Sequence, residues 1–547
     1  MRKSLLLGGA TLALAVSACG DPLNVVNINN PDVERAYSTP EGVEAVVAGL
    51  GVQLYNRQRT SEGANTQSKV FSGESFTTVN NFGGAPRAAI PRTPISNSLG
   101  NDIQAGNRDH FQNFSVQTRT ASNAIAAIDR LIASGGTIGS VGKDQRARSF
   151  GYFMLGQALA NLSYAYDSAA IVTPLTPSTE IPPLSGYADV NAAAVRMLDS
   201  AEAAAVLAAS DNSNFTMPAT WLSGNSFTRT EFLRLIRSMR ARVRAGAARN
   251  PAERAAVDWA KVIIDGTNGI TSDFVTEVGG STGWSGGYHV SQSYVTGGWH
   301  QAPMYYYGMA DVSGQYANWL ATPRDSRAAF LVQTPDQRWP QGATRAVQVA
   351  ESPSSVQIPA ARYMRNRPPG EDVPIGGWGQ SFYDHRRWGF IRVNNNSGGL
   401  VEMSRAESDL LAAEGYIRAG NFAAAAPLID RSRTAHGLPA LTGVVTDGTT
   451  PVPGGAACVP QVPVAPTYTT TACGNMWEAM KYEKRMETAF TGYMQWFNDH
   501  RGWGDMIEGT PLEWPVPYQE MQARRSAFYD GTLLAPTGTY RFGSGNQ

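Results

Sequence analysis

Charged side chains are scarce in this sequence of 547 residues, and neither sign is in excess. Lys, Arg, Asp and Glu make up 16% of the chain, and 45 basic residues balance 45 acidic ones, so the formal net charge is +0. A chain without a basic excess lacks the electrostatic footprint of a nucleic-acid-binding protein, so we expect no nucleic-acid partner. Hydrophobic residues reach 42%, which excludes disorder along the whole chain.

Catalytic signatures are also missing. The sequence contains no GxSxG, HExxH or P-loop motif, and no GxGxxG between a strand and a helix. Of six widely spaced histidines, only His289 and His300 share a loop, and ordinary hydrogen bonding explains them better than a metal pair. We therefore predict a protein that is not an enzyme and holds no metal or cofactor. A glycoside hydrolase stays open as an alternative, because its paired carboxylates need only be close in space. Its candidate acids, by location alone, are Asp311, Asp325, Glu351 and Asp372.

The N-terminus has the order of a secretory signal. Arg2 and Lys3 precede an apolar run over residues 5–16, which is too short to cross a bilayer as a mature helix. The following letters VSAC resemble a bacterial lipobox, in which cleavage leaves an acylated cysteine. We predict a signal peptide over residues 1–18 and a lipid-anchored mature protein over 19–547, with Cys19 as the lipid anchor. No later apolar stretch approaches transmembrane length.

Cysteine is rare, with three in the whole chain. Once Cys19 carries lipid, Cys458 and Cys473 remain, and in an exported protein two cysteines this close favour a disulfide. Their spacing is not CxxC and no histidine lies nearby, which disfavours a redox or metal role.

Amphipathic helical periodicity dominates the mature chain. Thr39, Pro40 and Glu41 are typical of a helix start, and apolar residues then recur on one face. Strand-like alternation is scarce, so the predicted fold class is mainly α. The predicted helices span about 39–56, 110–134, 143–166, 188–209, 228–248, 251–265, 402–419, 421–435 and 475–497.

Helix pairs joined by short turns predict a repeat. In residues 406–433, with Gly420 at the turn, small, aromatic and large apolar residues follow the tetratricopeptide order. Similar but weaker pairs occupy 145–209 and 230–265. Such pairs stack because each leaves an apolar face that its neighbour covers. A tetratricopeptide-like protein-binding adaptor is therefore a second alternative function.

Two long segments depart from the helical period, over about 57–108 and 266–400. The second is rich in Trp and Tyr among Gly, Ser, Asn and Gln. Long loops with this much aromatic content are more often functional than disordered. Aromatic rings stack on the apolar face of a sugar while polar neighbours bond its hydroxyls, so the composition favours ligand binding.

Several motifs together resemble the SusD/RagB-like outer-membrane lipoproteins, which capture nutrients for TonB-dependent transporters. The resemblance covers nearly all of the mature chain. It runs from STPEGVEAVVAGLGVQLYN at 38–56, through RARSFGYFMLGQALANLSYAY at 146–166, to the most specific block, YEKRMETAFTGYMQWFNDHRGWG at 482–504. Thr491 and the triplet Asn498-Asp499-His500 depart from the family pattern at positions we interpret as structural. Residues of the last block should form an ion-paired, aromatic brace: Glu483, Arg485, Glu487, Trp496, Asp499, Arg501 and Trp503.

The resemblance implies a tetratricopeptide-like scaffold with long irregular loop insertions. We expect the scaffold over about 20–265 and 400–547, and the loop-rich aromatic excursion over about 266–400. It also implies a SusC-like TonB-dependent transporter as partner, an oligosaccharide or peptide as ligand, and a location at the outer membrane. The family has no fixed ligand motif, so we predict the ligand contacts among aromatic residues of the two excursions: Phe76, Phe82, Trp284, Tyr288, Tyr294, Trp299, Tyr306 and Trp319.

Overall fold

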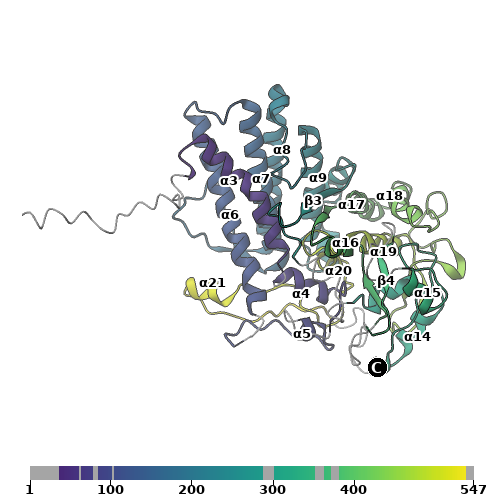
Figure 1. The fold of residues 1–547 in the computed structure, drawn as a ribbon. Coiled ribbons are helices and arrows are strands. Elements are labelled where there is room, and N and C mark those ends of the chain that lie inside the picture. Colours follow the sequence, from purple (N-terminus) through teal and green to yellow (C-terminus); the bar gives the residue numbers. More distant parts are fainter. Residues whose placement is uncertain are drawn as a thin grey trace, which may run out of the picture.

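Helices dominate the chain, as Figure 1 shows. The computed structural model describes residues 36–60, 63–77, 84–100, 104–287, 301–351, 362–370 and 381–536. It is about 51% helical, well above the ~30–35% of an ordinary globular protein, so the predicted mainly α class is confirmed.

The first half of the chain forms most of the helical scaffold. Its helices are α3 (Pro40–Gln58), α4 (Ala64–Phe71), α5 (Gly84–Ala88), α6 (Gln104–Ala133), α7 (Val141–Ala165), α8 (Tyr187–Leu207), the 3₁₀ helix η2 (Ala208–Asn214), α9 (Arg229–Gly246), α10 (Pro251–Ala255) and α11 (Trp259–Thr267). Local signals start several of them. Thr39 accepts a hydrogen bond from the backbone of Gly42, and Thr228 and Glu231 form a capping box.

The second half begins with short elements and ends with longer helices. It contains α13 (Met304–Tyr307), η3 (Gly308–Ala310), α14 (Gln315–Ala321), η4 (Arg324–Ser326), α15 (Arg345–Ala350), α16 (Gly389–Val393), α17 (Arg405–Arg418), α18 (Phe422–Ala435), η5 (Gly455–Ala457), α19 (Met476–Thr488), α20 (Gln495–Trp503) and α21 (Tyr518–Ala523). Residues 266–400 thus include only short helices and strands within their described parts.

The strands described by the structure form four small antiparallel pairs. They are β1 (Ser168–Ala170) with β2 (Leu184–Gly186), β3 (Phe274–Val278) with β6 (Gly398–Met403), β4 (Met364–Asn366) with β5 (Tyr383–His385), and β7 (Gln461–Pro463) with β8 (Thr471–Cys473). The β3–β6 pair brings together the start and the end of the long excursion.

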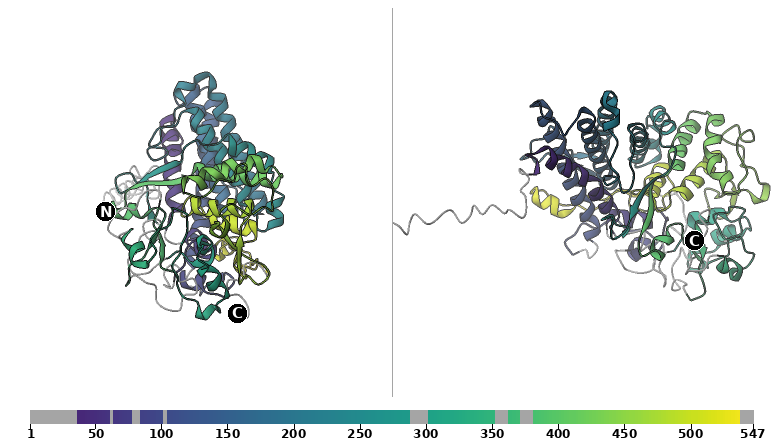
Figure 2. Two further views of the ribbon diagram at one scale, coloured as in Figure 1. Left: turned by 90° about the vertical axis from the view of Figure 1, so that its right-hand side faces the viewer. Right: turned by 45° about the horizontal axis from the view of Figure 1, so that its top comes forward.

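The long helices pack one against the next in a continuous stack (Figure 2). α6 packs on α3 and α7, α7 on α8, α8 on α9, α9 on α11, and α11 on α17. α11 and α17 touch although the excursion separates them in sequence, because Gly266 lets the backbones approach. A Cβ added at Gly266 would lie 2.9 Å from the carbonyl oxygen of Ser408. The excursion is therefore an insertion into one helical stack.

The predicted tetratricopeptide-like pair corresponds to α17 and α18. Ala413, Ala425 and Ile429 are fully buried between them. Gly420 turns the chain with φ +72°, in the left-handed region that favours glycine. Small residues at the contact allow the two helices to lie close together.

Two predicted helices are broken in the structure. Residues 251–265 form α10 and α11, because Asp258 caps a new helix by accepting from the backbone of Lys261. Residues 475–497 form α19 and the start of α20. The break follows from long-range hydrogen bonds: Phe490 N donates to the Glu74 carboxylate and Met494 N to the Asn65 side chain at 3.1 Å.

Candidate functional site

Three segments that are far apart in sequence meet at one seam. Phe76 and Gln301 each donate a backbone hydrogen bond to the other, both of 2.9 Å. Ala302 N donates to the carbonyl of Tyr383 at 2.9 Å, and Ser381 N donates to the Gln301 side chain at 3.2 Å. The first excursion is thus joined to two parts of the second. We refer to this junction of Phe76, Gln301 and Ser381 as the seam.

Four of the predicted ligand-contacting rings lie within the described residues, and all four are buried. Their exposed fractions are 5% for Phe76, 4% for Trp284, 1% for Tyr306 and 4% for Trp319. In the structure these four rings therefore pack in the interior and are not open to solvent. The excursion needs a core of its own, and its aromatic residues supply it.

The packing partners of these rings explain their burial. Trp284 stacks on Tyr55 of α3 with ring centroids 5.6 Å apart. Trp319 lies 4.4 Å below the guanidinium of Arg327, a cation–π contact. Tyr306 packs against a histidine of α20 and donates its hydroxyl proton to the backbone carbonyl of Asp505. Trp284 and Tyr306 thus hold the excursion on the scaffold, whereas Trp319 packs within the excursion.

The other predicted contacts, Phe82, Tyr288, Tyr294 and Trp299, lie outside the described residues, as does Cys19. Their places in the sequence relate them to the seam. Phe82 stands six positions after Phe76, and Trp299 stands two positions before Gln301.

Trp284 also reaches a glycine-rich hollow of about 420 Å³. Its lining is Gly279, Gly280, Gly283, Trp284, Ser285, Gly286, Gly287 and Asn396. Asn56 fixes this turn from α3, donating to Gly283 O at 2.9 Å and accepting from Ser285 N at 2.7 Å. Glycine is required at position 287, where a Cβ would lie 2.1 Å from the carbonyl oxygen of Arg59. The hollow offers backbone polar groups beside one indole edge.

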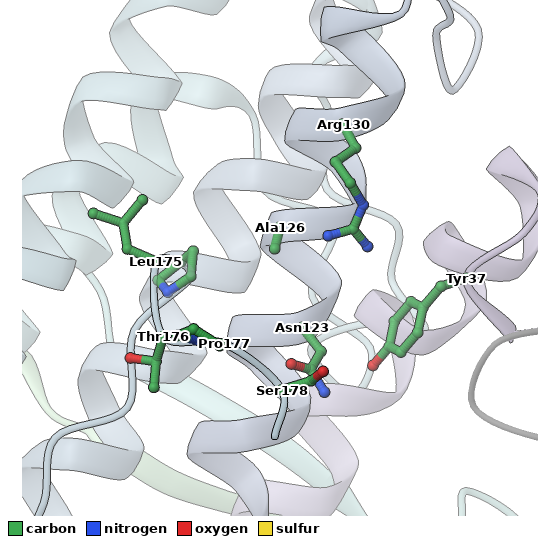
Figure 3. Close-up of a pocket in the computed structure, with 9 residues that line it drawn as sticks. Tyr37, Asn123, Ala126, Arg130, Leu175, Thr176, Pro177 and Ser178 are labelled. Atoms are coloured by element: carbon green, nitrogen blue, oxygen red, sulfur yellow. The ribbon is translucent and has the colours of Figure 1, made fainter. Parts of the chain in front are cut away.

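Two further hollows lie on α6. One, of about 410 Å³, is lined by residues of α6, Tyr37 and the loop between β1 and β2 (Figure 3). The other, of about 550 Å³, lies between α6 and α21 and includes Phe111, Val116 and Pro517. Neither contains the aromatic cluster that the sequence suggested.

The carboxylates considered for glycoside hydrolysis have structural partners. Asp311 is buried and accepts hydrogen bonds from the backbone of Tyr316 at 3.1 Å and of Gln333 at 3.0 Å. Glu351 pairs with Arg362 at 3.0 Å, and Asp325 pairs with the adjacent arginine. Asp372 lies outside the described residues. The three described acids therefore stabilise loops of the excursion through hydrogen bonds and ion pairs.

No cluster of three or more His, Cys, Asp or Glu side chains suited to a metal ion occurs in the described part of the chain. His289 and His300 lie outside it. Among the described helices, none is long and apolar enough to cross a membrane. The two cysteines predicted to pair, Cys458 and Cys473, form a disulfide with their Cα atoms 5.8 Å apart, at the β7–β8 hairpin.

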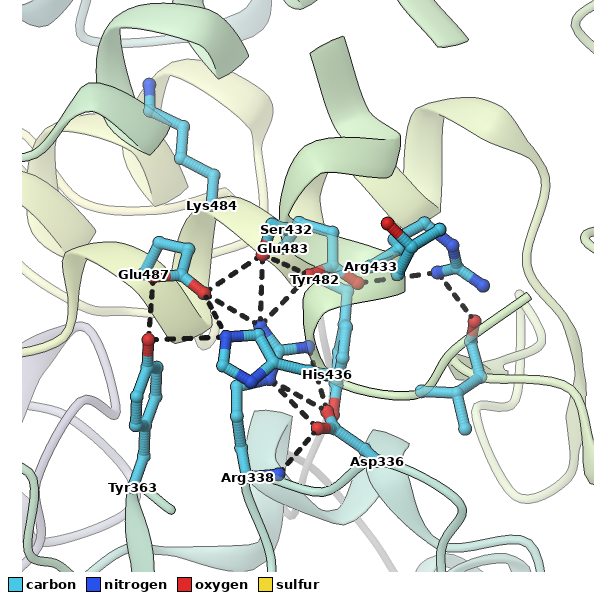
Figure 4. A network of polar contacts seen from close by, with 12 residues as sticks. Asp336, Arg338, Tyr363, Ser432, Arg433, His436, Tyr482, Glu483, Lys484 and Glu487 are labelled. Carbon is cyan, nitrogen blue, oxygen red and sulfur yellow. Dashed lines mark hydrogen bonds and ion pairs between the residues drawn. The ribbon is translucent and has the colours of Figure 1, made fainter. Parts of the chain in front are cut away.

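α19 carries a buried ionic network, shown in Figure 4. Arg338 pairs with Asp336 at 2.8 Å and with Glu483 of α19 at 2.9 Å. Glu487, one turn further along α19, accepts from the Tyr363 hydroxyl at 2.9 Å and lies 3.2 Å from His436 Nε2. The network joins α19 to the excursion and to α18.

The environment keeps Glu487 ionised. Burial by itself raises the pKa of this carboxyl, but the hydrogen bond from His436 and the charges of Arg387 and Arg338 outweigh burial and hold the pKa well below its usual range. An ionised carboxylate fixed by arginines in the interior suits a structural brace. The brace expected from the sequence is therefore present around α19.

The remaining members of the brace join α19 and α20 to the scaffold. Lys484 pairs with Asp499 at 2.8 Å, and Asp499 pairs with Arg254 of α10 at 3.1 Å. Arg501 donates to backbone carbonyls of α9 and of the segment that follows it. Trp496 donates its indole N–H to the carbonyl of Arg485 at 2.7 Å.

The sequence matches no protein-family model and no curated protein. Solved structures, in contrast, resemble this chain over most of its length. A SusD superfamily protein from Bacteroides thetaiotaomicron covers 89% of this chain and 97% of its own, with 12% identity and a TM-score of 0.53. A SusD homologue from Parabacteroides distasonis covers 88% and 93%, with 15% identity and a TM-score of 0.53. A SusD superfamily protein from Bacteroides vulgatus covers 89% and 90%, with 12% identity and a TM-score of 0.52.

At identities this low the likeness concerns the fold, and it covers 88–89% of this chain. The resemblance seen in the sequence is thereby confirmed at the level of the fold: this chain has the fold of the SusD superfamily.

Proposed function

We propose that the protein is a lipid-anchored outer-membrane protein that binds a nutrient of the oligosaccharide class and delivers it to a partner TonB-dependent transporter. The SusD-like fold supports this proposal, because the family that the sequence resembles performs this task. The lipobox-like VSAC before position 20 supports the anchor at Cys19.

The observation that carries the ligand proposal is the seam. Gln301 is hydrogen-bonded to Phe76 through the backbone and to Ser381 through its side chain. Three segments of the chain therefore meet at one place. Aromatic residues follow or precede these anchor points within a few positions in the sequence, among them Phe82 and Trp299. We propose that Phe82, Tyr288, Tyr294 and Trp299 form the ligand platform.

Aromatic rings suit this ligand class for a physical reason. The C–H face of a sugar ring packs on an aromatic face, and polar groups at the edge satisfy the hydroxyls. A few such contacts give weak binding, with a dissociation constant of roughly micromolar to millimolar. Weak binding suits a protein that must pass its ligand to a transporter.

The buried rings have a supporting part in this proposal. Trp284 and Tyr306 fix the excursion to α3 and α20, so they hold the seam in place. The proposed activity is binding without catalysis, in keeping with the structural partners of Asp311 and Glu351.

Isothermal titration of the signal-free protein with a panel of oligosaccharides and peptides tests the proposal. We expect saturable binding of at least one oligosaccharide, no cleavage of it on prolonged incubation, and weaker binding by Trp299→Ala. Cleavage abolished by a carboxylate substitution would favour the hydrolase alternative. Binding of peptides and of no oligosaccharide would show that the ligand is a peptide and contradict the proposed oligosaccharide class.

The transporter is tested separately. Mild detergent extraction of native outer membranes, followed by purification through a tag on this chain, should recover a TonB-dependent barrel in a fixed ratio. Recovery of the chain alone, with its ligand binding intact, would contradict the delivery step and leave the binding step standing.

A further inference from the structure

The loop between β1 and β2 presents two aliphatic side chains to solvent. Leu175 is 93% exposed and Ile181 is 78% exposed, and they are the most exposed large hydrophobic side chains among the described residues. Single exposed aliphatic residues are common on protein surfaces. Two in one short loop, both nearly free of contacts, call for an explanation.

The exposure of this loop is built into the fold. Arg119 of α6 donates to the carbonyls of Pro177 at 3.0 Å and of Glu180 at 2.7 Å. Arg524, which follows α21, donates to the carbonyl of Pro182 at 2.8 Å. Two arginines thus hold the backbone of the middle and the C-terminal part of the loop, while the side chains of Leu175 and Ile181 stay exposed.

The loop lies beside the start of the described chain. Tyr37 and Leu175 line the same hollow of about 410 Å³, and Figure 3 shows both with Arg130 of α6. Cys19 lies 17 positions before Ala36, so the chain between them spans at most about 60 Å. The described chain therefore begins at the end of the molecule that carries this loop, and the proposed anchor at Cys19 precedes that start in the sequence.

The chemistry of the loop suits a lipid surface. Over 173–181 it reads Thr-Pro-Leu-Thr-Pro-Ser-Thr-Glu-Ile, in which Glu180 is the one charged residue and the exposed positions are Leu175 and residues 177–181. Aliphatic side chains enter the acyl region, hydroxyl groups bond lipid headgroups, and the exposed Arg130 can face phosphates. Protein interfaces, in contrast, centre on aromatic residues and arginine in packed contacts.

We propose that the loop of residues 173–183 rests on the lipid bilayer that holds the anchor, with Leu175 and Ile181 inserted at the interface. The inference rests on the proposed anchor at Cys19. Its consequence is a fixed orientation. In Figure 1, α6 and α21 lie at one end of the molecule and β4, α14 and α15 at the other. Seating the first end on lipid fixes which end of the molecule faces the bilayer.

The cysteine content allows a direct test. The chain has three cysteines, of which Cys19 is the proposed acylation site and the other two form the disulfide, so one added cysteine is a unique label site. Acylated full-length Leu175→Cys and Ile181→Cys carry an environment-sensitive NBD label in vesicles of phosphatidylethanolamine and phosphatidylglycerol. Leu207→Cys, also exposed but at the far end of α8, is the control.

We expect the labels at 175 and 181 to brighten about twofold or more on vesicles and to be quenched by nitroxide lipids, because they leave water for the interface. The label at 207 should keep its value in water. Both labels remaining water-like on vesicle-bound protein would overturn the proposal. If the labels at 175 and 181 brighten with rising protein concentration in the absence of lipid, the loop contacts a second copy of the chain and the proposal is overturned.

If the labels at 175 and 181 brighten in native outer membranes but not in vesicles, the loop contacts a membrane protein. That result would also overturn the proposed contact with lipid. If the protein does not stay with vesicles at all, the anchor is wrong, and the proposed function fails before this inference. Ile181→Cys and Leu175→Cys are surface substitutions, and thermal unfolding matched to the unsubstituted protein verifies that each variant is folded.

Discussion

Arg254 and Glu414 form a buried two-point ion pair that joins α10 to α17. The guanidinium donates through Nε at 2.9 Å and through Nη2 at 2.6 Å, one bond to each carboxylate oxygen, and both side chains are fully buried. Breaking one side of a buried pair leaves an uncompensated charge. We therefore expect Glu414→Ala to lower the free energy of unfolding by about 3–5 kcal/mol, measured by urea denaturation.

An exposed ion pair supplies the matched control. Lys261 and Asp258 lie 3.0 Å apart with side chains about half exposed. Lys261→Ala should change the free energy of unfolding by less than about 1 kcal/mol. Equal losses for Glu414→Ala and Lys261→Ala would contradict the structural role assigned to the buried pair.

The same pair predicts a dependence of stability on pH. Burial by itself raises the pKa of Glu414, but the charge and hydrogen bonds of Arg254 outweigh it and lower the pKa from 4.5 to about 2. A lowered pKa in the folded state stabilises the fold above pH 4.5, and this contribution of about 3 kcal/mol is lost as the pH falls from about 4.5 to about 2. Denaturation at several pH values should show the gap between the protein and Glu414→Gln closing over that range. A constant gap would be inconsistent with this shift.

Removal of the disulfide should destabilise the protein without unfolding the scaffold. Cys458 and Cys473 close a loop of 15 residues, and cross-linking a loop of that length is worth about 3 kcal/mol. The double variant Cys458→Ser and Cys473→Ser should lose about that much in chemical denaturation, with an unchanged far-ultraviolet circular dichroism spectrum. A collapse of the helical signal would mean that the hairpin is required for folding of the stack.

Buried and platform tryptophans should respond in opposite ways to substitution. Trp319 is buried against Tyr316 and Arg327, so Trp319→Ala should cost about 3–5 kcal/mol of stability and leave ligand affinity unchanged. Trp299→Ala should weaken binding by about fivefold, since one stacking contact is worth about 1 kcal/mol, with little effect on the melting temperature. Thermal unfolding measures the stability of both variants, and titration with ligand measures their affinity. The reverse pattern would move the ligand platform away from Trp299.

Loss of the anchor should release the protein from membranes. Cys19→Ala removes the proposed acylation site, and the acyl chains are the apolar anchor expected after signal cleavage. We expect the variant in the supernatant after a salt wash, while the unsubstituted protein sediments with outer membranes. Sedimentation of both would contradict the lipobox interpretation.

Helix positions were largely predictable from the sequence because their signals are local. Thr39 with Pro40, and Thr228 with Glu231, mark helix starts within one turn, and apolar periodicity then sets the buried face. The turn at Gly420 is local as well, since its positive φ favours one residue type. The break between α19 and α20 was not predictable, because Glu74 and Asn65, both more than 400 positions away, accept the backbone hydrogen bonds of Phe490 and Met494.

In the aromatic excursion, too, the sequence predicted one property and distant tertiary contacts decided another. Its composition alone indicated a functional, ordered segment, and the order is present in its described parts. Which rings are buried could not be read from the chain, because Trp284 is covered by Tyr55 and Tyr306 by α20, partners that no periodic pattern connects.

Local chemistry in the sequence thus determined the mainly α class, the helix pair at Gly420, the cysteine pair and the family likeness. Tertiary structure decided the rest: the joining of Phe76 to Gln301, the choice of Glu414 as the partner of Arg254, and the burial of Trp319. Capping and periodicity act within a few residues, whereas burial and ion pairing depend on which distant segments the fold brings into contact.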